Sequence, residues 1–142
     1  MLKIVVVKLF KRGVHAYMKT IWTNGCFDIL HVGHMRLLKY AKSLGSVLVV
    51  GIDSDNRVQK LKSGRPVNSH NFRKEMLMGI RWVDHVVIFD SEQELKNLIK
   101  AYANLIVVGS DYKHKKVIGS EYSDVVFFDR GDGHASPNIL TQ

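Results

Sequence analysis

His31 and His34 are the side chains best suited to chemistry, because they flank a glycine where an expected strand gives way to an expected helix. Residues 19–24 alternate as a strand does, and from Met35 the apolar residues recur at helical spacing. A helix N-terminus presents unpaired backbone N–H groups and the positive end of the helix dipole, and Gly33 allows a ligand to approach closely. Two imidazoles add directed hydrogen-bond donors. This junction is therefore expected to bind phosphate.

Polar clusters also follow most of the other expected strands. Strands are expected over residues 19–24, 47–52, 83–89, 105–109 and 125–129, and helices from Met35, over 71–80 and over 91–102. The polar clusters comprise Asn24–His34, Asp53–Asp55 with the basic loop Lys60–Pro66, Gly109–Lys113 and Arg130–Asn138. Because the carboxyl ends of parallel strands meet at one edge of a sheet, these clusters are expected to form one site.

The alternation of strand and helix predicts a single α/β domain. We expect a Rossmann-like fold with an open, parallel, five-stranded sheet and helices on both faces. The continuous apolar run 47–52 is typical of a strand that is buried on both faces. The domain is expected to span residues 18–142, with Met18 as its functional start. Residues 1–17 are expected to be an N-terminal extension outside the site.

The composition suits one small domain that binds anions. Of the 142 residues, 46% are hydrophobic, which is enough for one core, and the formal net charge is +8. Cys26 is the only cysteine, so no disulfide within the chain is expected and the cytoplasm is the expected location. No apolar run approaches the roughly 20 residues that cross a bilayer, so no membrane partner is expected.

Gly25–Asp28 followed by His31-Val32-Gly33-His34 resembles the His-x-Gly-His signature of the cytidylyltransferase-like nucleotidyltransferases. The resemblance runs from about Met18 to about Leu140 and is nearest to heptose-phosphate adenylyltransferases and glycerol-3-phosphate cytidylyltransferases. It implies that a phosphate monoester attacks the α-phosphorus of a nucleoside triphosphate and releases pyrophosphate. ATP and a sugar phosphate such as heptose 1-phosphate are the favoured substrates, and CTP with glycerol 3-phosphate is the alternative.

The expected site residues fall into three groups. Catalysis, by neutralising charge on the phosphoryl oxygens, is expected from His31, His34, Lys62 and Arg73. The acceptor phosphate is expected to bind Lys60, Lys62 and Arg65. Contacts with the nucleotide are expected from Asn24, Gly25, Cys26, Phe27, Gly33, His34, Gly109, Asp111 and Ser136.

The reaction needs neither a general base nor a dedicated metal site in the chain. A phosphate monoester has its second pKa near 6, so at neutral pH it is already a dianionic nucleophile. Mg²⁺ is expected to accompany the triphosphate, held mostly by phosphate oxygens and water, and no residue is assigned to it. A zinc site on His31 and His34 is disfavoured, because the lone cysteine and the scattered acids offer no convincing further ligands.

Several residues near these motifs also have structural interpretations. Asp28 either binds a ligand or braces its loop. Cys26 is expected to be a small buried residue and not a nucleophile. The basic segment 60–65 could be a solvated charge run, although its place after a strand favours phosphate binding. Asp111 either selects a ribose or base or simply ends a strand.

The turn near the C-terminus departs from the family pattern. Ala135-Ser136-Pro137 stands where relatives usually have Ser-Thr-Thr, so only Ser136 offers a hydroxyl group to the phosphates. A catalytically silent nucleotide-binding protein is therefore an alternative. The positive charge motivates another alternative, a basic nucleic-acid-binding module, but no nucleic-acid-binding motif or aromatic platform is recognised. The expected partners are a nucleoside triphosphate and a phosphorylated sugar or polyol, and a homodimer is left open.

Overall fold

The computed structural model describes residues 19–129 of the chain. The predictions made for the N-terminal extension and for Ser136 lie outside the described residues. None of the helices within 19–129 is long and apolar enough to cross a membrane.

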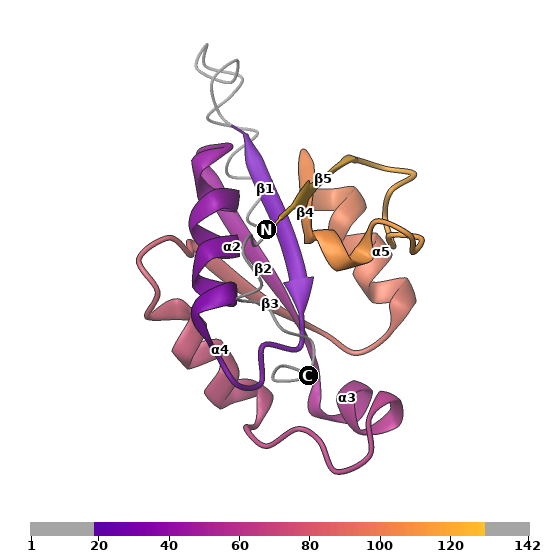
Figure 1. The fold of residues 1–142 in the computed structure, drawn as a ribbon. Coiled ribbons are helices and arrows are strands. Elements are labelled where there is room, and N and C mark those ends of the chain that lie inside the picture. The colour runs from indigo at the N-terminus through magenta and orange to yellow at the C-terminus, as the bar shows by residue number, and fades with distance from the viewer. Residues whose placement is uncertain (1–18, 130–142) are drawn as a thin grey trace.

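Five parallel strands form one sheet, as the sequence predicted (Figure 1). The strands are β1 (Thr20–Gly25), β2 (Val47–Asp53), β3 (His85–Phe89), β4 (Leu105–Gly109) and β5 (Asp124–Phe128). Their order across the sheet is β3-β2-β1-β4-β5, and every neighbouring pair is parallel. The chain order therefore reverses at β1, between β2 and β4. In open α/β sheets, ligands bind at the carboxyl ends of the strands beside such a switch point.

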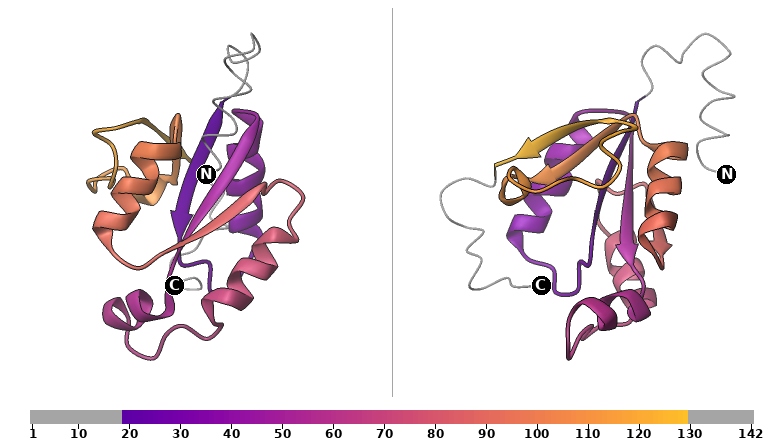
Figure 2. Two further views of the ribbon diagram at one scale, coloured as in Figure 1. Left: turned by 180° about the vertical axis from the view of Figure 1, so that it is seen from behind. Right: turned by 90° about the vertical axis from the view of Figure 1, so that its right-hand side faces the viewer.

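Helices cover both faces of the sheet, which confirms the predicted Rossmann-like architecture (Figure 2). In β2, Leu48 and Val50 pack in the core on the face of helices α2 (Val32–Ser43) and α4 (His70–Met78). Val49 points to the opposite face and packs with Trp22 against helix α5 (Glu92–Tyr102). Both sides of the strand are thus buried, as its continuous apolar sequence predicted.

A short helix, α3 (Asp55–Leu61), lies where the sequence was interpreted as a loop. Ser54 is its N-cap and accepts a hydrogen bond from the Arg57 backbone N–H at 3.2 Å. Asp55 in the first turn suits the helix dipole, and Val58 anchors the helix in the core. The helix lies beyond the carboxyl ends of the strands (Figure 1). A short 3-10 helix, η3 (Ser110–Tyr112), follows β4.

Candidate active site

The two histidines cap the N-terminus of α2 together. His31 is the N-cap residue, and its Nδ1 accepts a hydrogen bond from the Gly33 backbone N–H at 3.0 Å. The backbone N–H of His31 in turn donates to Nδ1 of His34 at 3.3 Å. This is a capping box in which histidines occupy the positions usually held by Ser or Thr and by Glu or Gln. The N–H of Gly33 is used within this cap, and the expected contact of Gly33 with the nucleotide stays a prediction.

The capping contacts determine which ring nitrogen of each histidine is a donor. Because Nδ1 accepts in both rings, each neutral imidazole carries its proton on Nε2. The ring centroids of His31 and His34 lie 3.7 Å apart, and the ring of Phe27 packs 5.0 Å from that of His34. Two Nε2–H donors are thus held at the positive end of one helix dipole. Such donors can stabilise negative charge that develops on a phosphoryl group.

The loop between β1 and α2 is shaped by the backbone of Phe27. Its φ of 51° lies in the left-handed region, which is uncommon for a bulky residue. The ring is only 5% exposed and belongs to the core on the α2 face. A Cβ atom on Gly25 would lie 3.2 Å from Cε2 of this ring, so a glycine leaves the room that Phe27 needs. The Phe27 ring therefore holds the loop as a core group, and its expected contact with the nucleotide stays a prediction.

Cys26 is half-buried in the same loop, and burial raises the pKa of its thiol. The nearby Arg73 guanidinium opposes this shift in the pKa. The thiol is therefore held in its neutral form, which agrees with the structural interpretation of Cys26. Its backbone carbonyl accepts a hydrogen bond from Arg73 at 2.9 Å.

Asn24 is oriented by a buried tryptophan on the same strand. The Nε1–H of Trp22 donates to Oδ1 of Asn24 at 2.8 Å. This contact fixes the orientation of the amide and directs its Oδ1 to the tryptophan, so Nδ2 is the Asn24 group suited to donate to a nucleotide. Gly51 is the neighbour of Asn24 in the sheet and lies against the Trp22 ring. The sequence did not single out Trp22, because a buried indole looks like any other core residue.

Asp28 braces its loop against the segment that follows α3. The carboxylate accepts hydrogen bonds from the backbone N–H groups of Val67 at 2.7 Å and Asn68 at 2.8 Å. Arg65 Nη1 donates to the same carboxylate at 3.2 Å. Burial alone would raise the pKa of Asp28, but these three donors outweigh it, so the pKa lies below its ordinary value. Of the two interpretations of Asp28, these contacts favour the brace.

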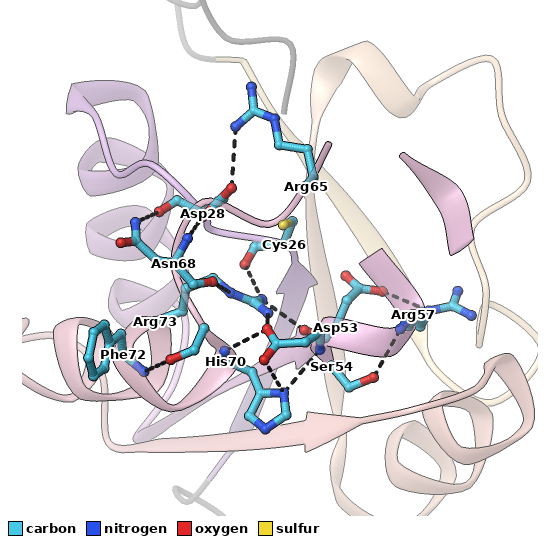
Figure 3. Close-up of polar contacts among 12 residues, drawn as sticks. Cys26, Asp28, Asp53, Ser54, Arg57, Arg65, Asn68, His70, Phe72 and Arg73 are labelled. Carbon is cyan, nitrogen blue, oxygen red and sulfur yellow. Dashed lines mark hydrogen bonds and ion pairs between the residues drawn. The ribbon is translucent and has the colours of Figure 1, made fainter. Parts of the chain in front are cut away.

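Arg73 has a different position from the one expected of a phosphate ligand (Figure 3). Its side chain is fully buried, and four of its N–H donors bind the chain itself. The acceptors are the backbone carbonyls of Cys26, Asp53 and Asn68, and the carboxylate of Asp55. A guanidinium has five such donors, so little capacity remains for a ligand. These contacts show that Arg73 holds the surrounding segments, and its expected catalytic contact with phosphate stays a prediction.

The remaining cations of the basic segment reach the surface. Lys60 lies in the last turn of α3 and is exposed, and Lys62 is the half-buried C-cap of that helix. The Lys62 charge lowers the pKa of the Cys26 thiol, against the larger effect of burial. Arg65 is 28% exposed along its side chain even though it pairs with Asp28. These three side chains are thus partly or fully exposed to solvent, and their expected contacts with phosphate stay a prediction.

The end of β4 contributes to the same edge of the sheet. β4 lies next to β1, where Ile106 pairs with Trp22. Gly109 ends the strand, and Asp111 follows in η3 with an exposed side chain. The topology thus places both residues at the edge where β1 ends.

The carboxylates around the site are engaged by cations of the chain. Asp28, Asp53 and Asp55 each pair with an arginine, at 3.2, 2.7 and 2.9 Å respectively. Within residues 19–129, no group of three or more His, Cys, Asp or Glu side chains is placed to hold a metal ion. The described residues therefore offer Mg²⁺ no site made of protein ligands alone.

Three further residues of the site, Asp55, His70 and Asn68, have no motif that would reveal them. Asp55 and His70 join the first turns of α3 and α4, because each donates its backbone N–H to the side chain of the other, at 3.0 and 2.8 Å. Asn68 contacts both Asp28 and Arg73. The only signal in the sequence for Asp55 is its position directly after a strand.

The sequence model of the family described as Cytidylyltransferase-like matches residues 22–127. The protein named "Bifunctional protein HldE" from Campylobacter fetus is 47% identical over 125 residues, covering 86% of this chain and 27% of the relative. The protein of the same name from Helicobacter hepaticus is 44% identical over 125 residues, covering 86% and 26%. The chain thus spans about a quarter of the length of these curated relatives.

Solved structures agree with the sequence matches. The lipopolysaccharide core biosynthesis protein from Thermoplasma volcanium superposes with a TM-score of 0.62 and 25% identity, covering 79% of this chain and 95% of that one. Pantothenate synthetase from Thermus thermophilus shares the fold, with a TM-score of 0.55 and 13% identity over 87% of this chain and 59% of the other. The paired histidines, the parallel sheet and the family match over most of the chain lead to one conclusion: the chain belongs to the cytidylyltransferase-like family and is a nucleotidyltransferase.

Proposed function

We propose that this domain transfers AMP from ATP to a sugar phosphate such as heptose 1-phosphate and releases pyrophosphate. The resemblance of Gly25–Leu30 and Gly109–Tyr112 to heptose-phosphate adenylyltransferases supports this choice of substrates. The similarity to proteins named HldE, and to a structure named for lipopolysaccharide core biosynthesis, points to the same area of carbohydrate metabolism. The paired, mutually capping histidines at the start of α2 are the single observation that carries the proposal.

The reaction is a displacement at the α-phosphorus. An oxygen of the acceptor phosphate dianion forms the new bond to this phosphorus, and the bond to the bridging oxygen of the β-phosphate breaks. Pyrophosphate leaves with the electron pair, so no proton transfer is needed at neutral pH. The barrier comes mainly from bringing two anions together in line and from the charge that builds on the α-phosphoryl oxygens.

The structure offers donors for this charge. His31 and His34 each carry an Nε2–H donor at the N-terminus of α2, where the helix dipole favours negative charge. Because the capping contacts fix both rings, the donors need little reorganisation when charge develops. Losing one such donor typically reduces turnover by roughly 10² to 10³-fold.

Cations of the basic segment suit the phosphates that repel each other. Lys60 and Lys62 are point charges on flexible stems, and Arg65 can bind a phosphate bidentately. Lys62 is the cation of this segment that we assign to the reacting phosphates as well as to the acceptor, and its charge acts on Cys26 in the β1–α2 loop. We include Mg²⁺ only as the counterion that enters with the triphosphate.

A panel of substrates tests the proposal. ATP, CTP, GTP and UTP are each combined with heptose 1-phosphate, glycerol 3-phosphate and phosphoethanolamine in the presence of Mg²⁺, and pyrophosphate release is measured. We expect the highest kcat/KM for ATP with heptose 1-phosphate. A higher kcat/KM for CTP with glycerol 3-phosphate would show that the proposed substrates are wrong and that the proposed type of reaction is right. Nucleotide binding without pyrophosphate release from any pair would instead favour a catalytically silent nucleotide-binding protein.

A further inference from the structure

Asn68 is the meeting point of two buried charged residues that come from different parts of the fold (Figure 3). Its backbone N–H donates to the Asp28 carboxylate at 2.8 Å, and its Nδ2 donates to the Asp28 carbonyl at 2.8 Å. Its own carbonyl accepts from Nε of Arg73 at 2.9 Å. Asp28 belongs to the β1–α2 loop and Arg73 to α4. The segment around Asn68 is thus fastened to both.

The hydrogen bonds of Asp28 also involve the basic segment. The Asp28 carboxylate accepts hydrogen bonds from the Arg65 side chain and from the backbone N–H groups of Val67 and Asn68. It therefore holds the segment at three of its residues. The backbone N–H of Arg65 points to the carbonyl of Lys62 at 3.4 Å. Asp28 thus contacts Arg65 directly, and the backbone of Arg65 links this contact to Lys62.

The Asp28 carboxylate finds its hydrogen-bond donors within the protein. Its side chain is fully buried, and both carboxylate oxygens accept hydrogen bonds from this one segment. A buried carboxylate requires such partners, so its contacts select one arrangement of the segment over others. The residue three positions further along the chain is His31, the cap of α2. Asp28 thus links the anchoring of the histidine loop to the anchoring of the cations.

We propose that Asp28 is a positioning residue for phosphate binding, which acts through the segment 65–68 to hold Lys62 and Arg65 beside the paired histidines. Asp28 does not touch the substrate in this arrangement, because its carboxylate is occupied by Arg65, Val67 and Asn68. The inference rests on the proposed function, since it takes the site to bind phosphate.

The test compares two isosteric substitutions. Asp28→Asn keeps the shape of the side chain but replaces one acceptor oxygen with a donor that faces backbone N–H groups. Asp84→Asn is the matched control, because the Asp84 carboxylate also accepts a backbone N–H, from Leu48 at 2.8 Å, and binds a cation, Lys42, at 2.6 Å. Asp84 lies at the opposite end of β2 from the site. Both variants should be less stable than the parent, but only Asp28→Asn should have a lower affinity for phosphate.

Binding is measured by calorimetry with inorganic tripolyphosphate and with ATP, at fixed ionic strength. We expect Asp28→Asn to raise the Kd for both probes by about tenfold or more. This loss of affinity corresponds to the loss of one charge-assisted hydrogen bond. The KM values for the nucleotide and for the acceptor phosphate should both rise by a similar factor, with a smaller change in kcat. Asp84→Asn should keep the parental Kd and KM. Parental affinity in Asp28→Asn, or an equal loss in both variants, would overturn the positioning role.

A milder variant covers the case in which Asp28→Asn does not fold. Asn68→Ala removes only the contact from Nδ2 to the Asp28 carbonyl and leaves the backbone contacts in place. We expect it to weaken tripolyphosphate binding measurably, and an unchanged Kd would contradict the proposal. A parent that binds neither tripolyphosphate nor ATP would also overturn it.

The outcomes separate this inference from the proposed function. If the parent binds ATP and the two aspartate variants differ as expected, but no substrate pair yields pyrophosphate, the transfer reaction fails and the positioning role stands. If the parent is active and Asp28→Asn binds phosphate normally, the reaction stands and the positioning role fails.

Discussion

Replacing Gly51 by alanine should destabilise the protein through a clash with one buried side chain. A Cβ atom at this position would lie 2.5 Å from Cζ2 and 2.9 Å from Cη2 of Trp22. Carbon atoms in ordinary contact lie about 3.5 to 4.0 Å apart, so one of the two groups must move by about 1 Å. Trp22 is 0% exposed and packs in the core against α5, so it has little room to move.

The size of the effect follows from two opposing contributions. Inserting a methyl group into a packed core typically costs about 1 to 3 kcal/mol, and the short distance here argues for the upper end. Restricting the unfolded chain by replacing glycine contributes roughly 0.4 to 1 kcal/mol in the stabilising direction. The free energy of unfolding should therefore fall by about 2 kcal/mol. Because Trp22 Nε1 orients Asn24, nucleotide affinity should fall as well.

A double-mutant cycle with Trp22→Phe identifies the cause. A phenylalanine ring ends short of the Cζ2 and Cη2 atoms, so Gly51→Ala should cost little in that background. Urea unfolding of the parent, both single variants and the double variant gives the coupling energy, which we expect to be about 2 kcal/mol in favour of the double variant. Additive effects, within about 0.5 kcal/mol, would refute the clash as the reason for glycine at this position.

Three further predictions concern the site. His31→Asn keeps an N-cap acceptor, so stability should change little, while turnover falls by roughly 10² to 10³-fold like that of His34→Ala; near-parental kcat would remove that histidine from the mechanism. The folded-state pKa of Asp28 is lowered, so its stabilisation is present above about pH 5 and lost as the pH falls through the folded pKa. Urea unfolding should accordingly show Asp28→Asn about 3 kcal/mol less stable than the parent at pH 7, and a constant gap down to pH 3 would contradict this. Lys62→Ala should raise the pKa of the Cys26 thiol further, seen as a shifted pH dependence of alkylation, and an unchanged profile would place the ammonium group elsewhere.

The sheet and the histidine junction could be predicted because their signals are local. The apolar run of β2 is long enough to require burial on both faces, and alternation of strands and helices leaves few topologies. The change of periodicity and the residue pattern predicted a strand-to-helix junction at residues 31–34 with a helix from Met35, and α2 begins within that junction, at Val32. Neither inference needed contacts between distant parts of the chain.

Helix α4 shows where periodicity misleads. Phe72 and Met76 are one turn apart and apolar, yet they are 66% and 63% exposed. Arg73 and Leu77 occupy the buried face instead. The arginine is buried because carbonyl groups at the ends of β1 and β2 need donors, and that need is invisible in the sequence of the helix itself.

Distant partners explain why the role of Asp28 stayed open. The Asp28 carboxylate oxygens accept hydrogen bonds from backbone N–H groups that are 39 and 40 positions away in the sequence. No rule of local spacing predicts contacts over such a distance along the chain. The sequence pattern of an aspartate in a glycine-containing loop is the same whether the carboxylate binds a ligand or braces the loop. Only the folded arrangement, in which both oxygens meet one segment, distinguishes the two.

Burial also divides the four cations that the sequence grouped together. Arg73 has a fully buried side chain, and a buried guanidinium must find its acceptors within the protein, so a phosphate would have to displace contacts that hold three loops. Lys60, Lys62 and Arg65 keep contact with solvent and can exchange water for phosphate oxygens without such a cost. We therefore expect these three residues to account for most of the phosphate affinity and of its dependence on salt, because four Arg73 donors are already engaged within the chain.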